Sequence, residues 1–109
     1  MDAQTLVKRA AVKAHVLEKS ETMPPDMLAT HIETLNELLE TWRDDGIDLG
    51  LSLPLAADEE LDIDSSAVRT LTYNLAVEIG NDEHAAVPQL TVEIAERTKS
   101  SYRRCSNNC

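Results

Sequence analysis

The segment from Pro24 to Gly46 constrains the fold of this chain more than any other. Apolar residues recur in it at positions i, i+4, i+7, i+11 and i+14, which places them on one face of an α-helix. These residues are Leu28, Ile32, Leu35, Leu39 and Trp42. Pro25 suits the first helical turn, and Gly46 can end the helix in a left-handed conformation. The segment therefore predicts a long amphipathic helix that carries most of the core of a small domain.

Length and composition favour an all-α fold. A chain of 109 residues can build one domain around one core. The chain has no Phe, so Leu, Ile, Val and Ala must fill that core, which favours helices packed on helices. We therefore predict a small four-helix bundle over residues 1–101 and a flexible tail over residues 102–109.

Three further helices are predicted from Asp2 to about Leu17, from the region of Asp64 to Ile79, and after Pro88. The second of these is expected to end at Gly80-Asn81. The first carries an inward stripe of small and aliphatic residues, which are Ala3, Leu6, Val7, Ala10, Ala14 and Leu17.

Residues 47–55 connect the second and third predicted helices and alternate apolar with other residues, as in an extended loop or a short strand. Pro54 and two glycines argue against a central strand. Such an apolar segment must lie across its own helices or meet another subunit. The third helix is apolar on two sides, so it is either central or in contact with a neighbour. The candidate subunit contacts are Leu49, Leu51, Leu53, Tyr73 and Val77.

The formal charge of −10 is spread unevenly along the chain. Residues 1–20 carry a net charge of +2, residues 21–66 carry −12, and the remainder is neutral. An acidic middle argues against a nucleic-acid reader, which needs a basic face. It is compatible with a surface past which DNA slides, or with acids that only keep the protein soluble. No stretch has the apolar length of a leader or a membrane span, so we expect a soluble protein made in the cytoplasm.

Residue patterns that carry chemistry are weak. Cys105 and Cys109 have no second pair or nearby histidine for a zinc site, and a frayed polar tail is the preferred interpretation. Residues 58–64 are acidic but lack the central Gly and closing Glu of a calcium loop. No nucleophile stands in a recognisable catalytic context. The sequence therefore predicts a protein that is not an enzyme and holds no cofactor or metal.

Two asparagines interrupt the apolar helical stretches. Asn36 and Asn74 lie at the margin of the inward faces, and a buried amide without a partner costs about 1–3 kcal/mol. We expect each to bond to the backbone of the opposite helix, or the two to bond to each other. Trp42 is expected to anchor the core.

The same residues resemble a known family. Residues 35–47 resemble the "LN-x-x-L-x-x-W…G-[IL]" signature of tailed-phage head-to-tail connector proteins, the tail accessory or packaged-DNA stabilisation factors. Residues 71–79 resemble that family's second signature, "AL-x-YNLAVEL", in the same order and at a matching separation. The resemblance spans about residues 3–100. Its signature residues here are Leu35, Asn36, Leu39, Trp42, Gly46, Tyr73, Asn74, Leu75 and Ala76.

The resemblance implies a structural role in the virion, at the junction of head and tail. Such adaptors complete the head by forming a homo-oligomeric ring, usually of twelve copies, beneath the portal protein. They retain packaged DNA, which passes without sequence-specific binding, and they give a downstream tail protein its attachment platform. Portal docking would fall to Arg97, Tyr102, Arg103 and Arg104. The channel or the tail would be faced by Asp58, Glu59, Glu60 and Asp62.

Two alternatives stay open. One is a small acidic regulatory protein that binds another protein, as an antitoxin or inhibitor does. The other is an enzyme subunit, which would reveal itself through a metal or cofactor in the purified protein.

Overall fold

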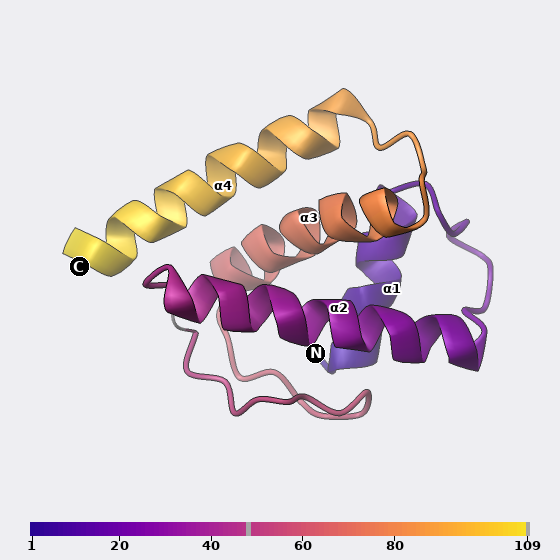
Figure 1. The fold of residues 1–109 in the computed structure, drawn as a ribbon, viewed down its shortest axis with the longest axis horizontal. Coiled ribbons are helices and arrows are strands. Elements are labelled where there is room, and N and C mark those ends of the chain that lie inside the picture. Colours follow the sequence, from indigo (N-terminus) through magenta and orange to yellow (C-terminus); the bar gives the residue numbers. More distant parts are fainter. Residues whose placement is uncertain (48, 109) are drawn as a thin grey trace.

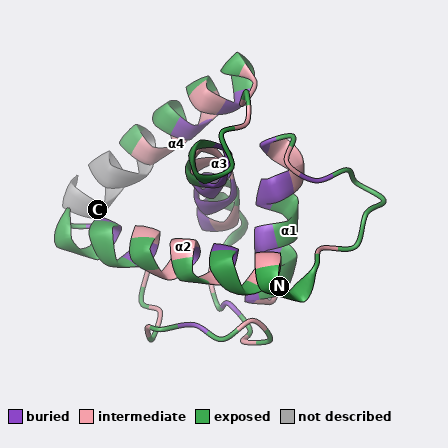
Figure 2. Cartoon of the chain, turned by 45° about the vertical axis from the view of Figure 1, so that its right-hand side comes forward, coloured by how far each residue is buried: buried purple, intermediate pink, exposed green. Residues whose placement is uncertain are grey.

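Four helices make up most of the computed structural model, which describes the backbone of residues 1–47 and 49–108 and the side chains of residues 1–47 and 49–100. The helices are α1 (Ala3–Lys13), α2 (Pro25–Asp44), α3 (Ser65–Asp82) and α4 (Gln89–Asn108). Helix α3 lies in the middle and packs against the other three (Figure 1). Figure 2 shows α3 nearly end-on between α1, α2 and α4. The predicted all-α four-helix fold is confirmed.

The link between α2 and α3 is an extended loop. Within the described residues, strand-type pairing is limited to one isolated bridge between Asp2 and Glu60. The alternative of a short strand in residues 47–55 is therefore wrong for the described part of that segment. The physical reason is that the segment packs its leucines on the helices instead of pairing its backbone with a second strand.

Side chains at two helix starts satisfy free backbone N–H groups. The Asp2 carboxylate accepts a bond from the Thr5 N–H of α1, and the Asp64 carboxylate accepts one from the Ala67 N–H of α3. Hydrogen bonds from the Thr5 hydroxyl and then from its N–H hold the pKa of Asp2 below its usual value. Helix α2 instead begins with Pro25, whose missing N–H needs no partner. These starts agree with the sequence prediction.

Helix α1 ends at Lys13 and not at Leu17. His15 has a left-handed backbone, with φ of 61°, and this turn redirects the chain. The N–H groups of Val16 and Leu17 both bond to the Ala11 carbonyl, at 3.0 and 3.3 Å. Leu17 is still buried, because the turn folds it back toward the core. Apolar spacing therefore predicted its burial correctly and its helical conformation wrongly.

Helix α3 continues through Gly80 to Asp82, so Gly80 does not end it as predicted. A Cβ atom at Gly80 would lie 2.0 Å from Cγ2 of Val87, which is far inside van der Waals contact. The loop after α3 is held there by a 2.8 Å bond from the Ala85 N–H to the Gly80 carbonyl. Gly80 is therefore required for the close approach of this loop to the helix.

Helix α4 extends to Asn108, beyond the boundary at residue 101 that the sequence suggested. The side chains of residues 101–109, and so Cys105 and Cys109, lie outside the described residues. The predicted flexibility of the tail stays a prediction.

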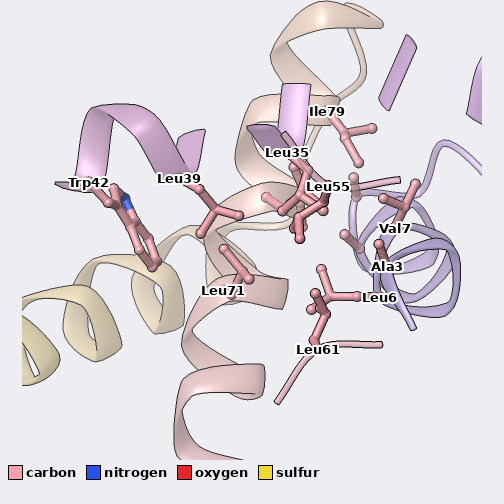
Figure 3. Packing of buried hydrophobic residues seen from close by; sticks show 14 of the residues in the cluster. Ala3, Leu6, Val7, Leu35, Leu39, Trp42, Leu55, Leu61, Leu71 and Ile79 are labelled. Atoms are coloured by element: carbon pink, nitrogen blue, oxygen red, sulfur yellow. The ribbon is translucent and has the colours of Figure 1, made fainter. Parts of the chain in front are cut away.

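One hydrophobic core joins α1, α2, α3 and the connecting loop (Figure 3). The inward stripe predicted for the first helix is buried in full, and Leu35, Leu39 and Trp42 of α2 are buried with it. Leu28 and Ile32 are half-buried at the edge of this core. None of the helices in the described part of the chain combines the length and the apolar character needed to cross a membrane.

Candidate functional site

The two signature segments lie on neighbouring helices and share the core. Leu35 and Leu39 of α2 belong to the same buried cluster as Leu71 and Leu75 of α3 (Figure 3). Ala76 is also part of this cluster. Residues that are about 40 positions apart in the sequence thus form one apolar contact surface, and the two signatures describe one structural unit.

Trp42 and Gly46 fix the end of α2. The Trp42 indole is buried, as predicted for a core anchor, and Lys99 Nζ of α4 lies 6.0 Å from its ring centroid. Gly46 has φ of 93°, which lets the Ile47 N–H reach back to the Trp42 carbonyl at 2.8 Å. The predicted left-handed stop is confirmed, and it directs the chain into the 47–55 segment.

Asn36 holds that segment against α2. Its Oδ1 accepts a 2.7 Å hydrogen bond from the Leu55 N–H, and its Nδ2 donates a 3.2 Å bond to the Leu55 carbonyl. The amide therefore pairs with both backbone groups of one buried residue, as a neighbouring strand would. The expectation that Asn36 is satisfied by backbone is confirmed, but the partner is the loop and not the opposite helix.

Asn74 performs a similar task on the other side of the molecule. Its Nδ2 donates to the Thr70 carbonyl at 2.7 Å within α3 and to the Ala95 carbonyl of α4 at 3.1 Å. The amide ties α3 to α4, and it reaches neither Asn36 nor α2. The predicted pairing between the second and third helices is therefore wrong, because α4 occupies this side of α3.

The candidate subunit contacts are covered in part by the protein itself. Leu49, Leu51 and Leu53 are half-buried and pack against the core cluster, while Ile47 and Leu55 are fully buried. Of the two open interpretations of this segment, the structure favours the one in which it lies across its own helices. Among the large apolar side chains described, Leu90 stands out as exposed, at 65%. Exposed apolar surface is therefore a weak argument for subunit contacts.

The two-sided third helix is explained by its central position. Val77 is half-buried on α3, which packs against α4 as well as α1 and α2. Tyr73 is half-buried beside two cations. Lys13 Nζ donates a 3.2 Å hydrogen bond to its hydroxyl and lies 4.5 Å from the ring centroid, and the Arg69 guanidinium lies 5.5 Å from the same centroid.

Tyr73 borders a feature that the sequence did not predict. A hollow of about 550 Å³ between α1 and α3 is lined by Tyr73 and by the cations Arg9, Lys13 and Arg69. A second hollow of about 450 Å³ shares Arg9 and Lys13 and adds Lys8 and Lys19. We call this surface the basic groove. The +2 charge of residues 1–20 was its signal, but the contribution of Arg69 depends on the packing of α1 on α3.

The acidic loop, residues 58–64, is hydrogen-bonded to the start of α1. The N–H groups of Ala3 and Gln4 donate to the carbonyls of Glu59 and Ala57, and the Glu60 carboxylate pairs with the N-terminal amine of Met1. Three of the four channel or tail candidates, Asp58, Glu60 and Asp62, are exposed, and Glu59 is half-buried. These bonds fix the loop on the surface, where it presents carboxylates to solvent.

The portal-docking candidates lie along α4. Arg97 is exposed. The side chains of Tyr102, Arg103 and Arg104 lie outside the described residues, although all three positions are helical.

His31 is a second feature that sequence reasoning missed. The imidazole is fully buried in α2, and neither ring nitrogen has a hydrogen-bond partner within the described part of the chain. Its Nε2 lies 3.6 Å from Glu83 Oε1. Burial lowers the pKa of His31, and the nearby carboxylates of Glu83 and Asp82 oppose that shift. Its position four residues before Leu35, on the inward side of α2, was the available signal.

The chemical groups on these surfaces can be stated for the described residues. The described residues contain no group of three His, Cys, Asp or Glu side chains placed to hold a metal ion. The two hollows of the basic groove carry cations, a tyrosine and hydroxyls. A third hollow, of about 580 Å³, lies at the turn after α1 and is lined by His15, Glu18 and Glu21 among others. Comparison of the chain with models of known protein families finds no match, and comparison with curated protein sequences finds none either.

Proposed function

We propose that this chain is a structural virion protein, a head-to-tail connector of a tailed phage. It assembles as a ring on the portal protein, retains the packaged DNA and provides the platform for tail attachment. The observation that carries the proposal is the pair of signature segments in order, 35–47 and 71–79, on two helices that share one core. Both signature asparagines form hydrogen bonds between elements, Asn36 from α2 to the connecting loop and Asn74 from α3 to α4, which gives their presence a structural reason.

The charge distribution supports the passage of DNA. Asp58, Glu60 and Asp62 are exposed, and phosphate groups would be repelled from a channel lined by these acids. Arg97 on α4 is the described cation that the proposal places toward the portal.

Electron microscopy of the protein mixed with the portal protein of its own virus tests the proposal. The expected result is a ring of additional density on one face of the portal. Arg97→Glu should weaken this complex, while Arg43→Glu, an equal charge change at an exposed position of α2, should leave it intact. Portal particles without added density would contradict the proposal.

The small exposed apolar surface favours one alternative, a small acidic regulatory protein that binds another protein. Size-exclusion chromatography with light scattering separates the two functions. A regulator stays monomeric or dimeric when portal is added, whereas a connector co-elutes with the portal in several copies.

A further inference from the structure

The basic groove is an unusual surface for so acidic a protein. Its cations are Lys8, Arg9, Lys13, Lys19 and Arg69, which is half of the ten lysines and arginines in the chain. Among the described residues, no carboxylate lines either hollow. None of the five cations forms a salt bridge within the described residues, whose ion pairs are those of Met1 with Glu60 and His31 with Glu83.

The floor of the groove is partly apolar. Ile63 and Val68 line the larger hollow together with the Tyr73 ring, over which Lys13 and Arg69 are held. Apolar walls lower the local dielectric constant and strengthen the attraction of an incoming carboxylate. The groove is therefore suited to acidic side chains presented from a firm surface.

The outer side of α2 offers such a surface. It carries a row of carboxylates at i, i+4, i+7 and i+11, all exposed, which are Glu33, Glu37, Glu40 and Asp44. We call this row the acidic stripe; it spans about 16 Å at ~1.5 Å per residue. Within the described residues, no salt bridge or side-chain hydrogen bond involves these four carboxylates. The loop at residues 58–62 is a poorer candidate, because Glu60 is already paired with the N-terminal amine.

We propose that the basic groove of one copy binds the acidic stripe of a second copy. Groove and stripe are different surfaces of one chain, the groove on α1 and α3 and the stripe on α2. Figure 1 shows how these three helices are arranged. A contact that two neighbouring copies make once is head-to-tail and generates a closed ring or an open filament, whereas a two-fold dimer would have to make it twice. This contact joins neighbouring subunits of the proposed ring, and in that respect it rests on the proposed function.

The contact also accounts for how copies with a charge of −10 can meet. At ~0.1 M salt the Debye length is about 10 Å, so distant like charges on two copies are largely screened while apposed opposite charges still attract. A nucleic acid would offer phosphates to the same cations. It would also meet the exposed acids of α2 and of residues 58–62, and the chain itself supplies a matching acidic row, which favours the second copy.

Charge reversal tests the contact with an internal rescue. The groove variant is Arg9→Glu with Arg69→Glu, and the stripe variant is Glu37→Lys with Glu40→Lys; all four residues are exposed. Sedimentation velocity at about 0.1 M NaCl should show that the wild type associates and that association weakens at about 1 M. Each variant alone should associate about tenfold more weakly or not at all. A mixture of the two should associate again, because each reversed surface then meets its opposite.

Control variants separate this contact from a general effect of net charge and from nucleic-acid binding. Arg43→Glu combined with Gln89→Glu and Ser100→Glu lowers the net charge by as much as the groove variant does, at exposed positions outside the groove and the stripe. This control should associate as the wild type does. Circular dichroism checks that each variant is folded. Association of the mixed variants would also show that both are folded, because unfolded chains would not form the contact. A labelled DNA duplex is titrated with the same proteins in parallel. If the wild type and the control variant bind DNA and the groove variant does not, the groove is a nucleic-acid site and the inference is overturned.

A wild type that stays monomeric at about 0.1 M NaCl, or a mixture that fails to associate, would also overturn the inference. If that protein still added density to the portal, the proposed function would stand and only the groove-to-stripe contact would be wrong. If the protein associated through the groove but ignored the portal, the contact would stand and the connector function would fall.

Discussion

His31 is placed where a charge is costly. Its imidazole is fully buried, and Glu83 at 3.6 Å is too far to form a good hydrogen bond. Because burial lowers its pKa in the folded protein, the unfolded chain binds a proton more readily, starting near the ordinary value of about 6.5. The free energy of unfolding is therefore highest above that pH and falls as the pH drops from about 6.5 toward the lowered folded pKa.

Urea unfolding between pH 7.5 and pH 5 measures this effect. His31→Leu removes the titrating group and satisfies the apolar site, so we expect it to flatten the pH dependence over this window. Glu83→Gln removes the carboxylate that opposes the pKa shift, so the loss of stability toward low pH should grow. An unchanged slope in His31→Leu would show that another group carries the pH dependence.

Gly80 is the residue at which a single methyl group should matter most. Ala is the better helix former by about 1 kcal/mol, but its Cβ would enter the space of the stiff Val87 side chain. Overpacking costs about 1–3 kcal/mol, so Gly80→Ala should lower the free energy of unfolding by up to about 2 kcal/mol net. Combining it with Val87→Ala opens the space, and the double variant should then be less destabilised than the sum of the two single changes. Additive effects would show that the loop yields without strain.

At the scale of elements, two asparagines connect pieces that the core alone does not fix. Asn36 satisfies both the N–H and the carbonyl of buried Leu55, whereas Asn74 donates to two carbonyls that lie within helices. Removing Asn36 therefore leaves a buried N–H without its partner, which costs about 1–3 kcal/mol. Asn74→Leu leaves no N–H without a partner.

We expect Asn36→Leu to destabilise the protein more than Asn74→Leu, with faster amide hydrogen exchange at Leu55 and its neighbours. Urea unfolding gives the ranking, and exchange measured by NMR locates the change. Equal exchange at Leu55 in the wild type and in Asn36→Leu would contradict the role assigned to this amide.

The sequence predicts an element correctly where local residues determine it, and incorrectly where contacts with distant residues do. The apolar face of α2 and the carboxylate at Asp64 are local signals. For this reason the sequence predicts α2 and the start of α3 correctly. The end of α1 depends on the left-handed turn at His15, a residue that the sequence does not mark as a turn former there. The sequence predicts a helix end at Gly80, whereas the structure uses this glycine for close packing against Val87 of the following loop. That contact is between segments and cannot be seen in local sequence.

The candidate surfaces show the same division. The acidic stripe follows from helical spacing along one element, while the basic groove needs α1 and α3 side by side. Residues 47–55 form an apolar segment with two possible neighbours, and only the bonds from Asn36 and the packing on the core decide between them. Long-range partners of this kind are not encoded in periodicity.

At the scale of the whole molecule, α3 makes the domain cooperative. It contacts all three other helices, and its buried residues Leu71, Leu75 and Ile79 belong to the same cluster as those of α1 and α2. Removing α1, α2 or α3 would expose part of this cluster to water, and α4 is joined to the same unit through its packing on α3 and the bond from Asn74 to the Ala95 carbonyl. We therefore expect one unfolding transition in which all elements are lost together.

Trp42 makes this expectation measurable, because it is the single tryptophan and is buried at the end of α2 beside Lys99 of α4. Its fluorescence reports local packing, while far-ultraviolet circular dichroism reports helix content over the whole chain, and the two urea curves should coincide. Leu75→Ala should lower the free energy of unfolding by about 2–5 kcal/mol and move both curves together. Leu90→Ala, at an exposed position, should move neither by more than about 0.5 kcal/mol. If fluorescence changed at lower urea than helicity, the α2–α4 region would unfold separately, and a shared core around α3 would not describe the stability of this protein.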